Sequence, residues 1–403
     1  MDMYLERTLS KIIKEAAATF PVVLLTGARQ VGKTTLFERC KEPERISVTL
    51  DDPQVKWLAK NDPPLFLQTY PPPLLIDEVQ YAPELFPFIK MTVDRNRKKN
   101  LFWLTGSQPF NLMQEVSESL AGRVAILELY GLSQSEKCGR YDRPFLPDTI
   151  TTENRPTLNI YSLYETILRG SFPELCANPE LNRALFYSSY LKTYIERDIR
   201  QLIQIGDEHR FLTFVKTAAA RTGKLLNYND MAKDVDVSVN TIKTWISVLE
   251  TSGLIFLLQP YYNNIAKRAL KSPKLYFTDT GLCSYLCGWE TAETLANGAM
   301  NGAIFETYVI TEILKSYRHN GLFVNFFFYR DRDGKEIDLL IERNGLLYPI
   351  EIKRSASPKI DDVKHFKTLS QLGISTGKGT IICLYDKFLP LDNQTVIVPT
   401  AYL

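Results

Sequence analysis

The chain has 403 residues, of which 45% are hydrophobic and 23% are charged, and its formal net charge is +2. This length predicts about two to four domains, and the composition is that of ordinary globular proteins. No apolar run approaches the roughly 18 residues that a membrane span needs. The balanced charge gives no whole-chain argument for nucleic-acid binding, so such a function must rest on local patches. Residues 1–20 mix acids and bases and predict an amphipathic helix rather than a signal peptide, so we expect a cytoplasmic protein without a membrane anchor.

The first motif in the chain is a phosphate-binding loop. The apolar run 22–25 predicts a buried strand, and the spacing G-x-x-x-x-G-K-T follows it at residues 27–34. Glycines let the backbone bend closely around an anion, so that loop N–H groups and the next helix N-terminus point at the phosphates. We expect Lys33 to reach the β- and γ-phosphates of ATP and the Thr34 hydroxyl to hold Mg²⁺. The expected nucleotide contacts are Gly27, Ala28, Arg29, Gln30, Val31, Gly32, Lys33, Thr34 and Thr35.

A second apolar run, at residues 71–80, ends in the adjacent carboxylates Asp77 and Glu78. Successive side chains of a strand point to opposite sides, so the two carboxylates can take different roles. We expect Asp77 to join the magnesium shell and Glu78 to act as the catalytic base on the attacking water. A strand that stops at a solvated acidic turn has the same pattern, but its place after a phosphate loop favours the catalytic interpretation.

Residues 117–123, SESLAGR, predict a helix that stops at Gly122 and leaves Arg123 exposed. An arginine there could enter the nucleotide site of a neighbouring subunit, because phosphoryl transfer gains most from a cation on the developing charge. The other interpretation is a surface arginine that caps the end of its own helix. The spacing leaves both interpretations open.

Together these motifs resemble a family of archaeal and bacterial AAA+-like P-loop ATPases. The resemblance covers nearly the whole chain and is carried by GARQVGKTT, LLIDEVQ, LTGSQ, SLAGR, RGSFPEL and YIERDI. It implies ATP binding and hydrolysis, but no particular biological process. The implied fold is α/β and multidomain: a parallel P-loop NTPase sheet with helices on both faces, a helical lid, a winged helix-turn-helix and a C-terminal restriction-endonuclease-like domain.

The resemblance also implies two further nucleotide sensors. A third apolar strand, at residues 101–108, ends in small polar groups, and Ser107, or failing it Gln108, is at the position of the polar catalytic sensor. Downstream, Arg169 or the turn at Gly170 and Pro173 would sense the nucleotide from the lid.

Residues 206–262 have the pattern of a winged helix-turn-helix. Helices are expected at 211–221 and 229–234, and Ser238 caps a third helix that runs to about Thr251 and leads into an apolar strand. In a DNA reader the capped helix would present Asn240, Thr241, Lys243 and Thr244 to the major groove. A single basic residue on this helix is too little to neutralise DNA phosphates, which favours a structural or subunit-contact role. A basic stretch just beyond is the better candidate for nucleic acid, unless it is a solvated loop; it comprises Lys267, Arg268, Lys271 and Lys274.

From residue 299 the pattern is helix, three strands, helix and strand, at 299–317, 323–330, 335–342, 346–353, 358–372 and 380–385. This order resembles the restriction-endonuclease-like fold, with Glu306, Asp338, Glu351 and Lys353 at its motif positions. Asn344 and Gly345 signal a hairpin that brings Asp338 beside the strand on which Glu351 and Lys353 share a face. We expect the three carboxylates to hold Mg²⁺ and Lys353 to activate water for attack on a phosphodiester. Solvated edge strands, or a relic that binds without cutting, remain alternatives.

The expected domains are an ATPase core (1–137), a linker and lid (138–205), the winged helix (206–262), a basic connector (263–295) and the nuclease-like domain (296–403). The leading prediction is an Mg²⁺-dependent ATPase with a C-terminal metal-dependent nuclease-like domain, assembled as a homo-oligomer, that acts on DNA or RNA. The alternative is an ATP-gated switch or scaffold whose C-terminal domain binds a protein or nucleic acid without cutting it.

Overall fold

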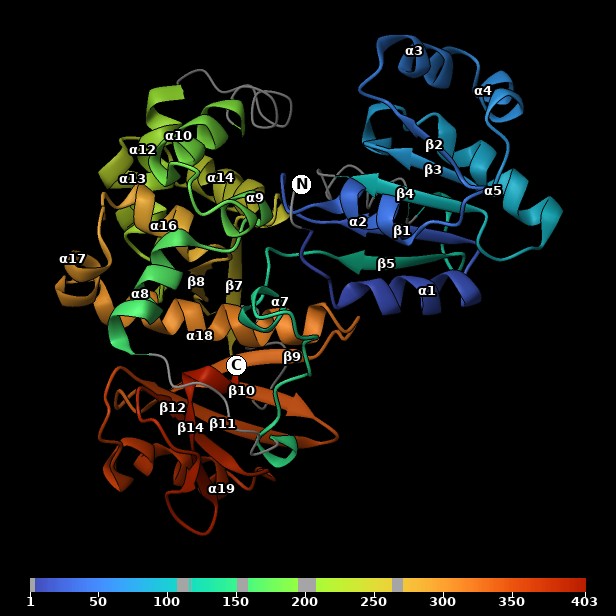
Figure 1. The fold of residues 1–403 in the computed structure, drawn as a ribbon. Coiled ribbons are helices and arrows are strands. Elements are labelled where there is room, and N and C mark those ends of the chain that lie inside the picture. The colour runs from blue at the N-terminus through green and yellow to red at the C-terminus, as the bar shows by residue number, and fades with distance from the viewer. Residues whose placement is uncertain (1–3, 107–115, 117, 151–158, 195–207, 263–270) are drawn as a thin grey trace.

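The computed structural model describes residues 4–106, 116, 118–150, 159–194, 208–262 and 271–403. Its N-terminal part contains a five-stranded parallel sheet in the order β2-β3-β4-β1-β5 (Figure 1). The strands are β1 (Val22–Thr26), β2 (Ile46–Thr49), β3 (Leu74–Asp77), β4 (Phe102–Gly106) and β5 (Val124–Glu128). Every residue of β1 and β4 is buried, as expected for central strands of a parallel sheet covered on both faces.

Helices cover both faces of this sheet. They are α1 (Leu9–Thr19), α2 (Lys33–Cys40), α3 (Pro53–Asn61), α4 (Pro63–Thr69) and α5 (Leu85–Asn96), with a 3₁₀ turn at Val79–Tyr81. Val23 belongs to the apolar cluster that contains residues of α1 and α2, whereas Val22 belongs to the cluster that contains residues of α3, α4 and α5. The alternation of side chains along β1 therefore builds two cores from one strand.

The region after β5 is helical. Its described elements are α7 (Gln134–Lys137), a 3₁₀ turn at Pro147–Thr149, α8 (Ile160–Arg169), α9 (Pro173–Ala177) and α10 (Arg183–Tyr194). Next comes a unit of three helices and three strands: α12 (Glu208–Ala219), β6 (Lys224–Leu225), α13 (Tyr228–Val235), α14 (Val239–Thr251), β7 (Ile255–Pro260) and β8 (Lys274–Phe277). The Ser238 hydroxyl accepts a hydrogen bond from Thr241 N at 3.0 Å, which confirms the expected cap of α14. Strand β8 pairs antiparallel with both β6 and β7.

The C-terminal part follows the predicted order from its helix at Asn301–Arg318 to its strand at Gly379–Cys383, except that the helix expected at 358–372 is a 3₁₀ segment followed by a short α-helix. It consists of α16 (Thr280–Leu286), α17 (Ala292–Asn297), α18 (Asn301–Arg318), β9 (Asn325–Arg330), β10 (Glu336–Arg343), β11 (Leu346–Lys353), a 3₁₀ segment at Ile360–Phe366, α19 (Lys367–Gln371), β12 (Gly379–Cys383), β13 (Leu389–Pro390), β14 (Thr395–Pro399) and a 3₁₀ turn at Thr400–Tyr402. Strands β9, β10 and β11 form an antiparallel meander, and β12 lies parallel to β11. Asn344 and Gly345 both have positive φ, which confirms the predicted hairpin.

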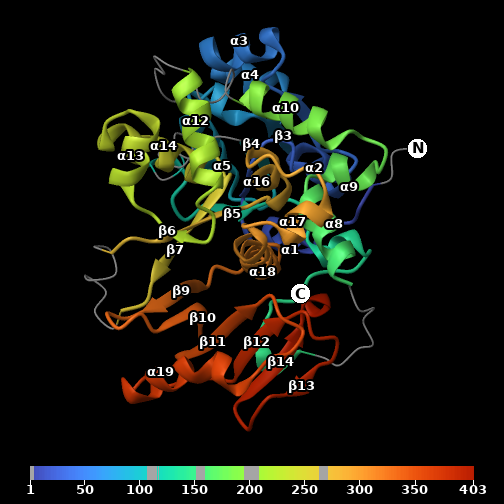
Figure 2. The ribbon, with the colours of Figure 1, turned by 90° about the vertical axis from the view of Figure 1, so that its left-hand side faces the viewer.

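The two regions after the helical segment share one sheet, which the sequence did not predict. Strand β7 pairs parallel with β9, so nine strands run in the order β13-β14-β12-β11-β10-β9-β7-β8-β6. The described part of the expected connector, residues 271–295, holds β8, α16 and α17 rather than an extended link. Helix α18 lies between this sheet and the helical region (Figures 1 and 2). In the described residues, no helix has the length and apolarity that crossing a membrane requires.

A buried ion cluster joins the N-terminal segment to α18. Arg7 Nε lies 3.1 Å from Glu136 Oε2, and His319 Nδ1 lies 2.9 Å from Asp142 Oδ2 and 3.5 Å from Glu136 Oε1. Glu136 also accepts a hydrogen bond from Thr8 N at 2.8 Å. Burial alone would raise the pKa of Glu136, but His319 and Arg7 hold that pKa below its usual value. Each carboxylate in the cluster therefore has an ion-pair or hydrogen-bond partner.

We predict that Glu136→Ala destabilises the protein by about 3–5 kcal/mol, because it leaves buried Arg7 without its carboxylate. Glu15→Ala is the matched control, since Glu15 pairs with Lys11 only on the surface, at 3.8 Å, and should cost less than about 1 kcal/mol. Denaturant unfolding of both variants measures the difference. Equal unfolding midpoints for the two variants would show that the cluster stabilises the protein no more than a surface ion pair does.

Candidate functional site

The phosphate-binding loop connects β1 to α2 and contains the predicted nucleotide contacts in one continuous turn. Gly27 and Gly32 have φ of 144° and 91°. A Cβ at Gly27 would lie 2.1 Å from the carbonyl oxygen of Leu129, so no larger residue fits there. Lys33 is 7% exposed, and its ammonium donates to the carbonyl oxygens of Gly27 and Ala28, both at 2.9 Å. The Lys33 ammonium thus points into the loop in which it is expected to contact the phosphates.

Asp77, the predicted magnesium ligand, lies beside the first turn of α2. Its Oδ1 accepts hydrogen bonds at 2.6 Å from the hydroxyls of both Thr34 and Thr105, and its Oδ2 accepts one at 3.3 Å from Thr49. Glu78 follows with φ of 57°, and its carboxylate accepts a hydrogen bond from the Gln80 side chain. The arrangement places a hydroxyl and a carboxylate, two oxygen ligands that suit Mg²⁺, in direct contact.

Thr105 is a site residue that the sequence analysis missed. It lies on β4, is fully buried, donates to Asp77 and accepts a hydrogen bond from Glu78 N at 3.0 Å. One hydroxyl therefore fixes both acidic residues at the end of β3. The sequence feature that could have identified Thr105 is a polar residue inside an otherwise apolar strand. The predicted sensor Ser107 and its alternative Gln108 lie outside the described residues.

Arg123 and the phosphate loop lie at opposite ends of the parallel strands. Because β5 runs parallel to β1, the residue before β5 is level with the start of β1, whereas the loop follows its end. The guanidinium contacts Asp94 at 2.6 Å through Nε and at 3.2 Å through Nη2, and this hydrogen bonding lowers the pKa of Asp94. It also donates to the carbonyl oxygen of Ala121 at 3.2 Å. This position is too remote for the chain's own loop, and action on a neighbouring subunit stays a prediction.

The RGSFPEL turn lies next to the phosphate loop. The Pro173 ring is 3.8 Å from the place that a Cβ on Gly32 would take. The buried carboxylate of Asp279 anchors this turn by accepting hydrogen bonds from Ser171 N at 2.6 Å and from Ser171 Oγ at 2.7 Å. Arg169 donates instead to the carbonyl oxygens of Leu175 and Asn178, at 2.8 and 2.6 Å. In this structure Arg169 thus organises the turn, while Pro173 lies close to Gly32 of the loop.

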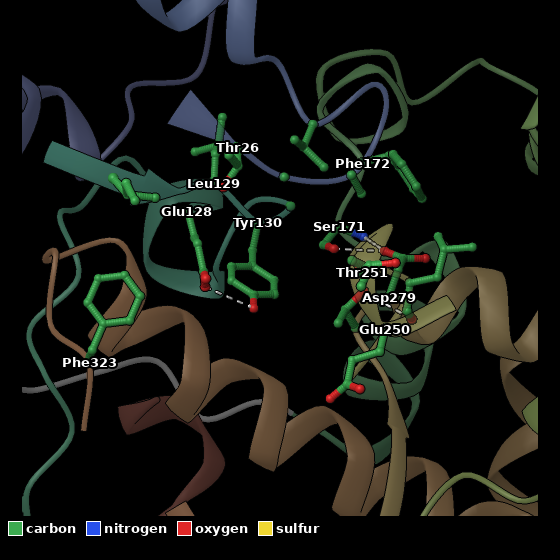
Figure 3. A pocket seen from close by; sticks show the side chains of 18 residues that line it. Thr26, Glu128, Leu129, Tyr130, Ser171, Phe172, Glu250, Thr251, Asp279 and Phe323 are labelled. Atoms are coloured by element: carbon green, nitrogen blue, oxygen red, sulfur yellow. Dashed lines mark hydrogen bonds between the residues drawn. The ribbon is translucent and has the colours of Figure 1, made fainter. Parts of the chain in front are cut away.

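A cavity of about 450 Å³ adjoins the start of the phosphate loop (Figure 3). Its lining includes Gly27 and Ala28 of the loop, Phe172 of the anchored turn, and Glu250 and Gly253 where α14 leads into β7. A Cβ at Gly253 would lie only 3.3 Å from Ala28 N. Residues of the loop and of the α14–β7 turn thus line the same cavity, and the two segments lie close together.

The predicted nuclease-like residues lie around the start of β10 and the end of β11. Lys353 Nζ contacts Glu351 Oε1 at 2.5 Å, and Asp338 Oδ2 accepts a hydrogen bond from Ile352 N at 2.8 Å. The pairing of β10 with β9 shifts register between Ile337 and Leu340, at the position of Asp338, and such a bulge re-aims a side chain. Burial raises the pKa of Glu351 to about 8, and the nearby Asp338 adds to this shift. Asp338, Glu351 and Lys353 thus lie on two paired strands, as the predicted hairpin requires.

Glu306, on α18, is held by groups from β8. Its Oε1 accepts hydrogen bonds from Tyr276 OH at 2.5 Å and from Lys274 Nζ at 3.1 Å. Lys274 also lies 2.6 Å from Glu336 Oε1, and only 5% of its side chain is exposed. The prediction that Lys274 belongs to an exposed basic patch is therefore wrong, because these carboxylates keep it buried. Of the other patch members, Lys271 is exposed, and Lys267 and Arg268 lie outside the described residues.

The expected metal site is not assembled in this structure. Within the described ranges, one group of at least three His, Cys, Asp or Glu side chains has all its ligand atoms within 4.8 Å of one another, and it is the Glu136–Asp142–His319 cluster. Glu306, Asp338 and Glu351 do not gather this closely, and lysines contact Glu306 and Glu351. The donor set of the C-terminal cluster therefore does not fit a bound divalent ion in the arrangement described.

Comparisons with known proteins agree with the N-terminal geometry. Residues 19–138 match the family model described as AAA domain, and residues 160–293 and 301–403 match two domains of unknown function, DUF8612 and DUF4143. The uncharacterized proteins Rv2008c of Mycobacterium tuberculosis and Mb2031c of Mycobacterium bovis are each 31% identical over 96% of this chain and 82% of their own length. The Walker-type ATPase PABY2304 of Pyrococcus abyssi has a TM-score of 0.47 at 14% identity, over 70% of this chain and 96% of its own. The AAA-domain match, together with the parallel sheet and its phosphate loop, confirms the P-loop NTPase fold of the core.

Proposed function

Because the chain belongs to the family that includes these two mycobacterial proteins and has an AAA domain with a complete phosphate loop, we propose that it binds ATP with Mg²⁺ and hydrolyses it. The observation that carries this proposal is the 2.6 Å contact between the Thr34 hydroxyl and the Asp77 carboxylate. It brings together the end of β3 and the start of α2, the two places from which P-loop NTPases hold their metal ion. The magnesium ion, when bound, neutralises charge on the phosphates.

The loop residues supply binding. Backbone N–H groups of residues 27–35 and the N-terminus of α2 favour the negative charge of the phosphates. Lys33 already donates to two loop carbonyls, and phosphate oxygens are stronger, charged acceptors for the same ammonium. Thr34 and Asp77 would hold the metal ion. Lys33 and the loop thus bind and orient the terminal phosphate.

The end of β3 supplies the chemistry. Glu78 would take a proton from the attacking water, and Thr105 would keep Glu78 and Asp77 at fixed positions through its two hydrogen bonds. Tyr81, one helical turn further on, lies 3.4 Å from the Arg29 guanidinium, so the loop and this strand end are also joined by a side-chain contact. Groups held in this way need little reorganisation when the reaction occurs.

We further propose that ATP acts as a switch on the rest of the chain. The α14–β7 turn lines the same cavity as Ala28 of the loop, and this closeness supports the proposal, because a rearrangement of the loop on nucleotide binding would change the surroundings of the turn. The unit from α12 to β8 has the element order of a winged helix, and α18 with β9 to β12 has the order of a restriction-endonuclease-like domain. Asn240, Lys243 and Thr244 are exposed on α14, which supports contact with DNA or RNA there. A homo-oligomer and a cytoplasmic location stay predictions.

Lys33→Ala should abolish ATP binding, because the cation contacts the phosphates in both the ground and transition states. Glu78→Gln should bind ATP normally and hydrolyse it about 100-fold or more slowly, because it loses only the proton acceptor. Calorimetric titration with ATP and phosphate release measure the two steps. Glu84→Gln, which changes an exposed carboxylate at the start of α5, is the matched control. Unchanged hydrolysis in Glu78→Gln would remove this residue from the reaction.

Thr105→Val should lower kcat by roughly 10-fold or more and leave the affinity for ATP nearly unchanged, because it frees Asp77 and Glu78 from their shared hydroxyl. Thr49→Val removes a longer, 3.3 Å contact to the same carboxylate and should have a smaller effect. Steady-state kinetics separate kcat from KM. A larger loss in Thr49→Val than in Thr105→Val would contradict the positioning role of Thr105.

If subunits share sites, Arg123→Ala and Lys33→Ala proteins should each be inactive, and mixing them should restore some hydrolysis at hybrid interfaces. Asp94→Ala is the control, since it removes the ion-pair partner of Arg123 and should retain hydrolysis. A monomer in the presence of ATP, or no recovery after proven subunit exchange, would show that Arg123 only binds Asp94 and the end of its helix.

A further inference from the structure

Lys274 is a buried cation that the proposed ATPase does not use. It is the first residue of β8, and that strand lies two places away from β9 in the nine-stranded sheet, beyond β7. Its ammonium contacts Glu306 at 3.1 Å and Glu336 at 2.6 Å. These two partners come from α18 and β10. A lysine of β8 therefore places its ammonium among carboxylates of α18 and β10.

The surroundings of Lys274 are strongly acidic. Four carboxylates gather in this region: Glu306 on α18, Glu336 and Asp338 on β10, and Glu351 on β11. Burial alone would lower the pKa of Lys274, but Glu306, Asp338 and Glu336 raise it above its usual value. Lys353 contacts Glu351 at the solvent-exposed side of the cluster, and 38% of the Lys353 side chain is exposed. Lys274 is thus the inner positive charge of the cluster, and Lys353 is the outer one.

An ammonium and a divalent ion compete for the same oxygens. A magnesium or manganese ion requires ionised carboxylate oxygens at about 2.0–2.2 Å and a nearly regular set of ligands around it. An ammonium directs three N–H donors at the same oxygens from a greater distance and thereby keeps them apart. Because Lys274 is covalently attached, it is present at this position at a high effective concentration without any ion in solution.

We propose that Lys274 is the resident cation of this carboxylate cluster and that it excludes divalent metal ions from it. The failure of Glu306, Asp338 and Glu351 to gather as metal ligands follows directly, because two lysines supply the positive charge that a metal ion would otherwise provide. The same contacts fasten β8 to α18 and β10. The C-terminal domain would then act as a binding domain rather than as a metal-dependent nuclease.

Manganese binding to the full-length, nucleotide-free protein tests this proposal, with the electron paramagnetic resonance signal of free Mn²⁺ as the readout. Lys274→Met removes the ammonium but keeps most of the side-chain volume, and it should bind one more Mn²⁺ than the wild type, roughly 10-fold or more tightly than any site there. Adding Asp338→Asn should abolish the gain. The phosphate loop is the same in all variants, so the differences report on the cluster alone.

Lys335→Met is the matched control, because 42% of the Lys335 side chain is exposed in the same sheet region, 3.9 Å from Asp331, and its loss should leave Mn²⁺ binding unchanged. A folded Lys274→Met protein that gains no Mn²⁺ would overturn the proposal. The comparison of wild type with Asp338→Asn decides the matter even if Lys274→Met does not fold: equal Mn²⁺ binding supports exclusion, and a loss of Mn²⁺ in Asp338→Asn contradicts it. None of these results depends on ATP hydrolysis.

Discussion

The contacts of Arg7 are the constraint on which the arrangement of the chain depends. Its guanidinium donates to the carbonyl oxygen of Val31 in the phosphate loop at 3.0 Å and to that of Tyr130 after β5 at 2.6 Å, and it pairs with Glu136. Five donors in a fixed plane allow one arginine to hold three segments at once. Because Glu136 also contacts His319, the loop is connected through two side chains to the end of α18.

Helix α18 extends this connection to the C-terminal cluster. At 18 residues it is about 27 Å long, and it is buried along most of its length. Glu312 accepts a hydrogen bond from Gln134 N at 2.8 Å, and Lys315 donates to the carbonyl oxygen of Leu132 at 3.0 Å, so one end is fastened to the segment after β5. Glu306, nearer the other end, belongs to the carboxylate cluster. A rigid helix thus joins the two chemically distinct sites of the chain.

Sequence patterns predicted those parts of the structure that local contacts determine. The strand, glycine loop and helix at residues 22–40 and the hairpin at Asn344 and Gly345 each rest on neighbouring residues, and both are present. The pairing of β7 with β9 and the hydrogen bonds of Thr105 depend on residues far apart in the chain. No local spacing encodes such partners, so the shared sheet and the residue that positions Asp77 could not be read from the sequence.

Lys274 shows why a run of basic residues is weak support for a nucleic-acid surface. Its neighbours in sequence are basic, but its neighbours in space are Glu306 and Glu336, and an ammonium paired with buried carboxylates offers no net attraction to phosphate. Lysine is also costly to bury without such partners, so the carboxylates and the lysine stabilise each other's charged forms. The four carboxylates outnumber the two lysines of the cluster, so the cluster offers no basic surface, whereas α14 presents the exposed Lys243 to solvent. Any electrostatic attraction of nucleic acid to the described part of this region must come from such exposed residues rather than from the cluster.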